Sequence, residues 1–146
     1  MIHILQGVDI VAVSKMKSIM LARPEFATEI FTDRERRYCF SWPDPYVHLA
    51  GRFAAKEACL KALGTGLSGS GIDGALREIE VAPERSGRPA LSLSGWTEKI
   101  GRRRKVYQYT VSISHSEGFA IASVILASKK PDEESGKESS REIPSS

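Results

Sequence analysis

The spacing of apolar residues changes along the chain, and each spacing predicts a different element. Residues 2–13 alternate and then run apolar, with many Ile and Val, which is typical of a strand. From Ser14 the apolar residues recur at the spacing of one helix face, and Pro24 marks the end of this first helix. Thr32 with Glu35 three residues later forms a capping box, which predicts a second, short helix.

The longest helix is expected over residues 45–63, because a Trp-Pro-Asp-Pro break precedes it and the Gly64-Thr65-Gly66 turn follows it as a C-cap. Glycines within 69–74 indicate a flexible loop. Residues 76–81 then alternate as a strand, and residues 89–93 form another. The short glycine-containing turn between these two strands makes them a hairpin.

The remainder of the folded chain combines a short helix with two long strands. Ser94 can cap an amphipathic helix that runs through about Gly101. A basic segment at 102–105 leads into two β-branched runs, 106–114 and 119–127. Strands that are separated partly by helices and partly by tight turns indicate an α+β fold, in which an antiparallel sheet packs on one long central helix.

Composition divides the chain into a folded domain and a tail. The chain has 21 Lys and Arg against 18 Asp and Glu, a net charge of +3, and 41% of its residues are apolar. Residues 129–146 contain one apolar and no aromatic side chain, too little to offset the entropy of ordering. We therefore expect one domain, residues 1–128, and a disordered polar tail, residues 129–146. The tail has four basic and five acidic residues, so the domain alone carries +4.

Apolar run length and cysteine content argue against a membrane protein and against a disulfide-linked secreted one. The longest apolar run, 119–127, is half of the roughly 20 residues that a spanning helix needs. The N-terminal strand lacks a basic leader and is interrupted by Gln6 and Asp9, unlike a signal peptide. Cys39 and Cys59 are accordingly expected as reduced thiols of a cytoplasmic protein.

Asp9 stands inside the apolar run Gly-Val-Asp-Ile-Val, where a buried carboxylate without a partner is unfavourable. Two kinds of partner can meet this charge: a Lys or Arg in a structural ion pair, or a divalent metal that Asp9 shares with a second carboxylate. Mg²⁺ commonly takes one or two protein carboxylates and completes its shell with water and phosphate oxygens. Glu57, at the edge of the apolar stripe of the long helix, is the candidate for the second carboxylate.

Basic side chains that suit phosphates accompany Glu57 on the long helix. Arg52, Lys56 and Lys61 all lie within about one and a half turns of this carboxylate. Residues one turn apart also form ordinary solvated ion pairs, so the helix alone leaves both interpretations open.

Two further segments have both a structural and a ligand-binding interpretation. The Gly64-Thr65-Gly66 turn lets the backbone approach a ligand closely, or serves only as a helix C-cap. Ser114 and His115 end a strand, where they can donate hydrogen bonds to a polyphosphate or simply face solvent.

Three blocks of sequence carry a family resemblance when they are taken together, in order and spacing. They are Gly7-Val-Asp-Ile-Val11, then Arg52-Phe-Ala-Ala-Lys-Glu-Ala58 with Lys61-Ala-Leu-Gly-Thr-Gly66, and finally Val111-Ser-Ile-Ser-His115. These blocks resemble holo-[acyl-carrier-protein] synthase, the small type of 4′-phosphopantetheinyl transferase. The likeness spans nearly all of residues 1–127 and leaves the tail outside.

This resemblance implies an activity and the residues at its centre. The 4′-phosphopantetheine arm of coenzyme A would be transferred to a serine of an apo acyl carrier protein, with release of 3′,5′-ADP and a requirement for Mg²⁺. Asp9 and Glu57 fall on the metal-binding carboxylates of the family, and Lys61 falls on its lysine near the reacting phosphates. The group that takes the serine proton stays open.

The resemblance also implies coenzyme A contacts and an assembly. His115, next to Ser114, and the Gly64-Thr65-Gly66 turn fall where the family contacts coenzyme A, and Arg52 and Lys56 are phosphate partners. Small members of the family are homotrimers with sites between protomers, so residues of two chains can complete one site.

Acyl carrier proteins are acidic, so the enzyme needs a cationic docking face. Lys15, Lys17 and Arg23 on the first helix are the candidates. The family usually has an acid soon after the Asp-Ile-Val block and an arginine at the place of Lys15, where this chain has Ala12 and lysine. Because lysine lacks the bidentate fork of arginine, this departure bears on which carrier protein is bound.

A small basic nucleic-acid-binding module is the strongest rival, since residues 102–105 read Arg-Arg-Arg-Lys. The modest net charge of the domain, and the absence of aromatic residues among these basic ones, argue against nucleic acid as the partner.

Overall fold

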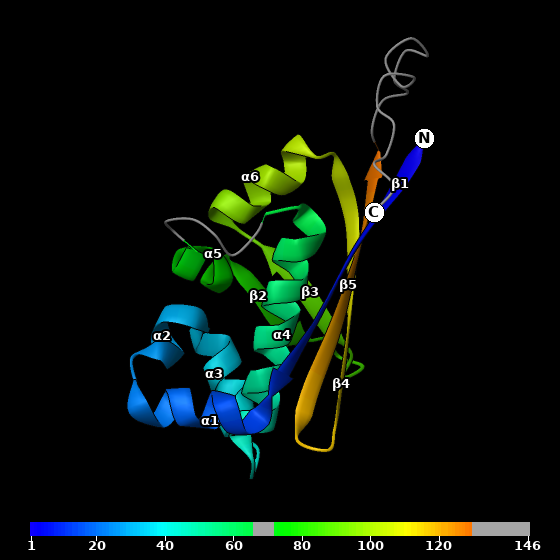
Figure 1. Ribbon diagram of the computed structural model, residues 1–146. Helices are drawn as coiled ribbons and strands as arrows, with labels where there is room; N and C mark the ends of the chain where they lie inside the picture. Colours follow the sequence, from blue (N-terminus) through cyan, green and yellow to red (C-terminus); the bar gives the residue numbers. More distant parts are fainter. Residues whose placement is uncertain (66–71, 130–146) are drawn as a thin grey trace, which may run out of the picture.

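The computed structural model describes residues 1–65 and 72–129, and they form an α+β fold around one long helix (Figure 1). Three strands form an antiparallel sheet in the order β1-β5-β4, and two more pair separately as an antiparallel hairpin. The strands are β1 (Ile2–Ala12), β2 (Ile79–Pro83), β3 (Pro89–Leu93), β4 (Val106–Ser116) and β5 (Phe119–Lys129). The expected fold class is confirmed.

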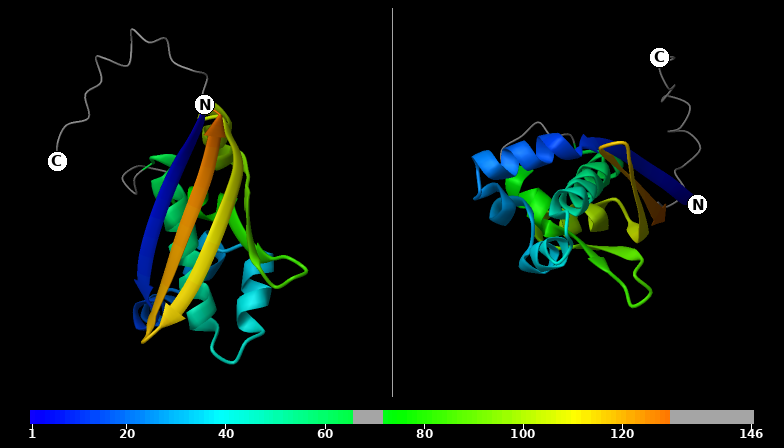
Figure 2. Two further views of the ribbon diagram at one scale, coloured as in Figure 1. Left: turned by 90° about the vertical axis from the view of Figure 1, so that its right-hand side faces the viewer. Right: turned by 90° about the horizontal axis from the view of Figure 1, so that it is seen from below.

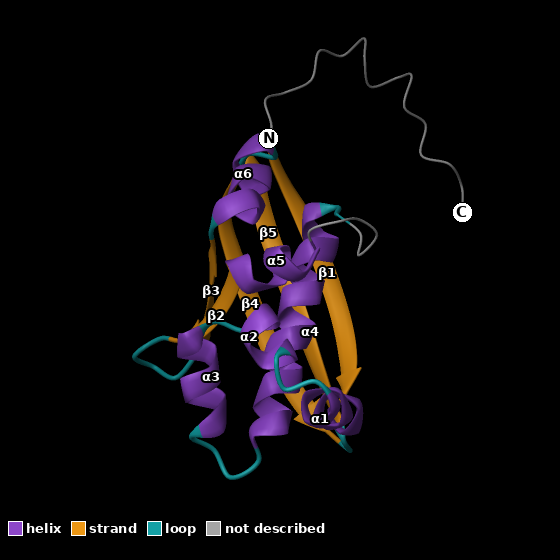
Figure 3. Ribbon diagram, turned by 90° about the vertical axis from the view of Figure 1, so that its left-hand side faces the viewer, coloured by secondary structure: helices purple, strands orange, loops and turns teal. Residues whose placement is uncertain are grey.

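Helices cover one face of the three-stranded sheet and leave the other face bare (Figure 2). In the described ranges they are α1 (Val13–Ala22), α2 (Phe26–Ile30), α3 (Asp33–Phe40), α4 (Pro45–Leu63), α5 (Ile72–Glu78) and α6 (Gly95–Arg103). Helices α1, α2 and α3 gather toward one end of the molecule and α6 lies at the other, with α4 running between them (Figure 3). A search of the described helices finds none with the length and hydropathy to cross a membrane.

Helix α4 has the limits that the sequence predicts, and its caps explain them. The carboxylate of Asp44 accepts a hydrogen bond from the backbone nitrogen of Tyr46 at 3.2 Å, and Pro45 occupies the first helical position. Gly64 ends the helix with a φ of +79°, a left-handed conformation that favours glycine. The helix is buried largely through small residues: Ala50, Gly51, Ala54, Ala55, Ala58 and Ala62.

Strand β1 approaches α4 more closely than a side chain would permit, and Gly7 makes this approach possible. A Cβ atom on Gly7 would overlap the carbonyl oxygen of Ala58 and lie 2.8 Å from the backbone nitrogen of Ala62. Asp9 follows two residues later on the same face of the strand. The contact at Gly7 therefore sets the distance between Asp9 and the middle of α4.

Strands β4 and β5 form a long hairpin around a two-residue loop, Glu117-Gly118. Both loop residues have positive φ, 54° and 80°, as the tight turns that match strand twist require. The paired strands then run together over most of their length, from the Ser116–Phe119 pair to the Val106–Ser128 pair, with one irregularity near Val106.

The bare face of the sheet is apolar. On β5, the side chains that alternate toward α4 are buried, while those on the opposite face are exposed. In the single chain the exposed apolar residues of this outer face are Ile2, Ile4, Val8, Ile10, Phe119, Ile121 and Ile125. Patches of this kind mark interaction surfaces more often than ordinary solvated surface.

The structure corrects two local predictions. Residues 76–78, expected in a strand, end helix α5, because the Leu76 carbonyl accepts from Lys56 and Arg77 donates to the Phe31 carbonyl at 2.7 Å. Ser94 does stand at the start of α6, but its hydroxyl donates to the Glu78 carbonyl at 3.3 Å. Instead, the carboxylate of Glu78 caps the helix by accepting a hydrogen bond from the Thr97 backbone nitrogen at 2.9 Å.

Two other predictions fall partly or wholly outside the described residues. Gly74, expected in a flexible loop, lies in α5, whereas Gly69 and Gly71 are outside the described ranges. Lys129, the first residue of the expected tail, closes β5, and the rest of the tail is outside.

Replacing Gly7 by alanine tests the close approach of β1 to α4. Gly7→Ala should lower the free energy of unfolding by about 1–3 kcal/mol, because the new methyl group would push against backbone atoms that cannot move aside. The measurement is urea unfolding followed by circular dichroism. Gly74→Ala is the matched control: its Cβ would meet nothing within 4 Å, so it should be neutral or stabilising. Equal stability of Gly7→Ala and the wild type would contradict the packing described.

Candidate active site

Asp9 meets a cation from its own chain. The ammonium group of Lys61 on α4 donates to Asp9 Oδ1 at 2.9 Å and to the Val8 carbonyl at 3.1 Å. The Asp9 side chain is only 12% exposed, whereas that of Lys61 is 50% exposed. The ion pair considered from the sequence is therefore present, and Lys61 remains open to a ligand from the solvent side.

The second carboxylate predicted from the sequence, Glu57, lies beside Asp9. The pKa of Glu57 is raised to about 7, chiefly by burial and then by a hydrogen bond with Asp9 and the charge of Asp9, against the opposing effect of Lys61 and Lys15. The other carboxylate oxygen of Asp9, Oδ2, is buried and has no hydrogen-bond partner. Two close carboxylates with an unsatisfied oxygen are an arrangement that a bound cation would relieve.

The donor set fits a hard divalent cation that keeps open positions. No group of three or more His, Cys, Asp and Glu side chains within the described ranges could enclose a metal ion. Asp9 and Glu57 thus provide only two protein carboxylates. This is the number that Mg²⁺ commonly takes when water and substrate phosphates complete its shell.

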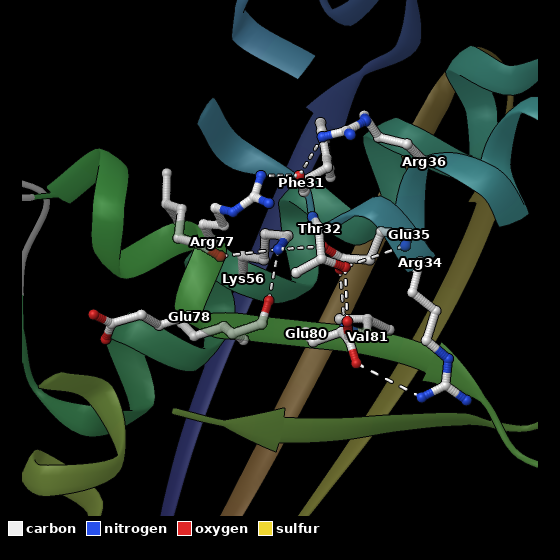
Figure 4. Close-up of polar contacts among 12 residues, drawn as sticks. Phe31, Thr32, Arg34, Glu35, Arg36, Lys56, Arg77, Glu78, Glu80 and Val81 are labelled. Carbon is white, nitrogen blue, oxygen red and sulfur yellow. Dashed lines mark hydrogen bonds and ion pairs between the residues drawn. The ribbon is translucent and has the colours of Figure 1, made fainter. Parts of the chain in front are cut away.

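The structure places Lys56 away from this site and corrects its predicted role in binding coenzyme A. Its side chain is fully buried, and its ammonium group donates to Glu35 Oε1 at 2.7 Å, to the Leu76 carbonyl at 2.9 Å and to the Ile79 carbonyl at 2.6 Å (Figure 4). These contacts use all three donors of the ammonium group. Lys56 therefore has no donor left for a phosphate.

Glu35 extends this buried network into α3 and β2. Its Oε1 also accepts from the Thr32 backbone nitrogen at 2.9 Å, which completes the predicted capping box, and its Oε2 accepts from the Val81 backbone nitrogen at 2.9 Å (Figure 4). The Thr32 hydroxyl in turn donates to Glu80 at 2.7 Å. A single buried ion pair thus joins α3, α4, α5 and β2, next to the helix position that bears Glu57.

Arg52 lies in a second cluster on another side of α4. Arg52 precedes Glu57 by five residues, which places it about 140° around the helix. Its guanidinium stacks 4.1 Å from the centre of the Tyr38 ring, and its Nε is buried without a partner. Trp42 stacks on His48 at 4.8 Å in the same cluster.

His48, to which the sequence assigns no role, lies in the same cluster through its contacts with Trp42 and Tyr38. Burial lowers the pKa of His48, and the charges of Arg52 and His115 lower it further, against a smaller opposite effect of Asp44. In the described residues, neither Arg52 nor His115 makes a hydrogen bond or an ion pair with Asp9 or Glu57. Ser114 is exposed at the end of β4, on the outer face of the sheet.

The remaining predicted contacts lie at the C-terminal end of α4 and on or next to α1. Gly64 and Thr65 close α4, with the Thr65 backbone nitrogen and hydroxyl both donating to the Leu60 carbonyl, and Gly66 lies outside the described residues. Lys15 and Lys17 are exposed on α1. Arg23 pairs with Glu25 at 3.4 Å and with Glu29 at 3.3 Å.

Cys39 and Cys59 are free and buried, as the sequence predicts. Burial raises the pKa of each thiol to about 12. Because the thiolate is the reactive form, neither cysteine is a candidate nucleophile.

Lys56→Met tests whether this lysine is structural. The variant leaves the Glu35 carboxylate buried without its partner, and should lose about 3–5 kcal/mol of unfolding free energy. Chemical unfolding of the wild type and of each variant measures this loss. Lys61→Met, a matched control on the same helix, should cost less than about 1 kcal/mol because its ion pair is partly exposed. Lys56→Met/Glu35→Gln should recover part of the loss. A Lys56→Met protein as stable as the wild type would disprove the assignment.

Comparisons with known proteins identify the family of this chain. Residues 6–124 match the family model described as the 4′-phosphopantetheinyl transferase superfamily. The holo-[acyl-carrier-protein] synthase of Caldanaerobacter subterraneus is 35% identical over 84% of this chain and 94% of its own length. The synthase of Chloroflexus aggregans is 40% identical over 82% of this chain and 91% of its own length.

A solved structure extends the similarity to the fold. The holo-[acyl-carrier-protein] synthase of Helicobacter pylori, in complex with coenzyme A, superimposes with a TM-score of 0.70 at 30% sequence identity. The match covers 84% of this chain and 99% of that protein. The chain belongs to the 4′-phosphopantetheinyl transferase superfamily and, within it, to the holo-[acyl-carrier-protein] synthases.

Proposed function

We propose that this protein transfers the 4′-phosphopantetheine group of coenzyme A to a serine of an apo acyl carrier protein, with Mg²⁺ and with release of 3′,5′-ADP. The single observation that carries the proposal is the convergence of Asp9, Glu57 and Lys61 from β1 and α4. The relatives named above support it, because they are holo-[acyl-carrier-protein] synthases and one of them was solved with coenzyme A.

Asp9 and Glu57 are the residues that would hold Mg²⁺. Bound there, the ion would neutralise negative charge on the diphosphate of coenzyme A. Lys61 supplies a second positive charge, and its half-exposed ammonium group can turn from Asp9 toward a phosphate oxygen. Together, the bound ion and Lys61 would supply the positive charge that a phosphoryl transfer needs.

The reaction balances without a covalent enzyme intermediate. The serine oxygen of the carrier protein attacks the β-phosphorus of coenzyme A, and the bond from that phosphorus to the bridging oxygen breaks. The bridging oxygen leaves with 3′,5′-ADP, and the serine proton passes to a base. Catalysis then rests on orienting the two substrates and on stabilising the charge that spreads over the phosphate oxygens. The buried, protonated Cys39 and Cys59 agree with this direct transfer.

A homotrimer with sites between protomers would complete the active site. Arg52 lies about 140° around α4 from Glu57, so a second copy of the chain is the simpler source of this charge for a ligand held at the carboxylate pair. The apolar outer face of the sheet offers the surface on which a neighbouring copy would pack, and Ser114 lies on that same face. The partner copy would then bring Arg52, Ser114 and His115 to the coenzyme A held by Asp9 and Glu57.

The acidic carrier protein would dock on α1, where Lys15 and Lys17 are exposed. Lys17 is exposed, and its ammonium group lies 5.6 Å from the centre of the Tyr46 ring. Arg23 contributes less to such a face, because its charge is already paired with Glu25 and Glu29. The free thiols of the protein fit a reducing compartment such as the cytoplasm.

Mass spectrometry of a carrier protein tests the transfer. Incubation of the protein with coenzyme A, Mg²⁺ and an apo acyl carrier protein should add one phosphopantetheine to the carrier. Asp9→Asn and Glu57→Gln should slow the transfer by about a hundredfold or more, because each removes half of the metal site.

Glu84→Gln is the matched control, since it neutralises an exposed acid in the turn between β2 and β3, away from α4. This variant should keep the wild-type rate. An unmodified carrier protein after incubation with the wild type would refute the proposed function, and wild-type rates in both site variants would refute the metal assignment.

A further inference from the structure

The basic segment 102–105 has no part in the proposed transfer, and it follows α6 at the end of the molecule opposite α1 (Figure 3). One member, Arg104, is half-buried, and its Nη2 would lie 3.1 Å from a Cβ atom on Gly64 at the end of α4. The other members are exposed, as are Lys99 on α6 and Lys129 at the end of β5. We call this surface the basic end, and its exposed members are Lys99, Arg102, Arg103, Lys105 and Lys129.

Little negative charge opposes the basic end. Within residues 1–65 and 72–129, the one acid that pairs with its members is Glu98, whose carboxylate lies 2.6 Å from Arg102. The side chains of Lys99, Arg103 and Lys105 form no ion pair and no hydrogen bond in the same ranges. The ammonium group of Lys129 lies over the Tyr107 ring, 4.9 Å from its centre. The basic end therefore has an excess of positive charge that an anionic partner can neutralise.

The chain leaves the described structure at this same end. The backbone nitrogen of Lys129 donates to the Lys105 carbonyl at 2.9 Å, and the Ser128 hydroxyl donates to the Arg104 carbonyl. These contacts hold the last described residue beside the basic segment. Residues 130–146 follow, with five acidic and three basic side chains, a net charge of −2.

Three of these acids come first, in the run Asp132-Glu133-Glu134. They follow Lys129 by three to five residues, so even a fully extended chain carries them no more than about 10–18 Å from it. Tethered at this distance, the acids face the basic end at an effective concentration on the order of millimolar. A contact between charges needs no fixed conformation, so it is compatible with a segment too polar to form a core of its own.

We propose that the acidic run 132–134 of this chain's own tail binds the basic end and shields it from other anionic molecules. Charge complementarity and the point at which the chain leaves the structure favour the tail over any free anion, which lacks the advantage of the tether. A shielded basic end would hold nucleic acid only weakly, because phosphate contacts supply most of such binding. The inference does not depend on the proposed transfer, since no substrate or metal enters the contact.

Two charge-matched variants test the contact by NMR. Glu133→Gln/Glu134→Gln and Glu138→Gln/Glu142→Gln each remove two negative charges from the tail, and only the first removes them from the acidic run. At about 20 mM NaCl, where screening is weak, the first variant should shift the Nε–Hε signals of Arg102 and Arg103, and the second should leave them at their wild-type positions. Raising NaCl to about 0.5 M should shift the wild-type signals in the same direction, because salt screens exposed charges.

Retention on a heparin column tests the shielding with a polyanion. Glu133→Gln/Glu134→Gln should elute at about 0.1 M more NaCl than Glu138→Gln/Glu142→Gln, although the two net charges are equal, because its basic end is open to heparin. Adding Arg103→Gln/Lys105→Gln to both variants should abolish this difference. Adding Arg85→Gln/Arg88→Gln, in the exposed turn between β2 and β3, should preserve it. Thermal melting of each variant verifies that it is folded.

The contrary results are distinct from a failure of the transfer reaction. Equal heparin retention of the two charge-matched variants, or unchanged Arg102 and Arg103 signals in both, would overturn the inference. Shifted amide signals of Lys15 and Lys17 in place of these would put the acidic run on α1, and would overturn it as well. A protein that meets both expectations but modifies no carrier protein would refute the proposed function and leave this inference standing.

Discussion

The close contact between β1 and α4 is the constraint on which the site depends. Gly7 lets the strand backbone rest directly against the helix backbone, and Asp9 and Glu57 consequently come within interaction distance in a partly buried setting. Two carboxylates so placed repel each other, and burial raises the cost of ionising both. Lys61 compensates for part of this charge through Asp9. A divalent cation would compensate for the remainder, so the fold holds an arrangement that is more favourable with its ligand than without it.

The buried pair of Lys56 and Glu35 supports this arrangement from the other side of α4. It links the helix to α3, α5 and β2 through groups that are shielded from solvent. Adjacent positions on the same helix thus have different tasks: Lys56 is directed into the protein to hold the surrounding elements, and Glu57 faces the ligand side. A motif that reads Lys-Glu in sequence contains one structural residue and one residue of the site.

The sequence predicts the features that depend on local chemistry. The limits of α4, the Thr32 capping box and the hairpin of β2 and β3 follow from caps, turns and spacing. The sequence does not reveal which basic residues of α4 are free, because helical spacing fixes their angles but not the elements that cover them. The buried ammonium group of Lys56 pairs with Glu35, which lies 21 residues away in the sequence. Arg104 reaches Gly64 through the packing of α6, and a run of four basic residues gives no sign of which one is directed inward.

The pH dependence of stability tests the interaction of Asp9 and Glu57 most directly. Glu57 ordinarily titrates at 4.5, and in the folded protein near 7, so folding loses stability as the pH rises between these values. Melting temperatures of the wild type and Glu57→Gln should be measured from pH 5 to 8, with a chelator and then with excess Mg²⁺. The wild type should lose stability relative to the variant as the pH rises in chelator, and Mg²⁺ should restore it in the wild type alone. Parallel curves for the two proteins under both conditions would contradict the shared site.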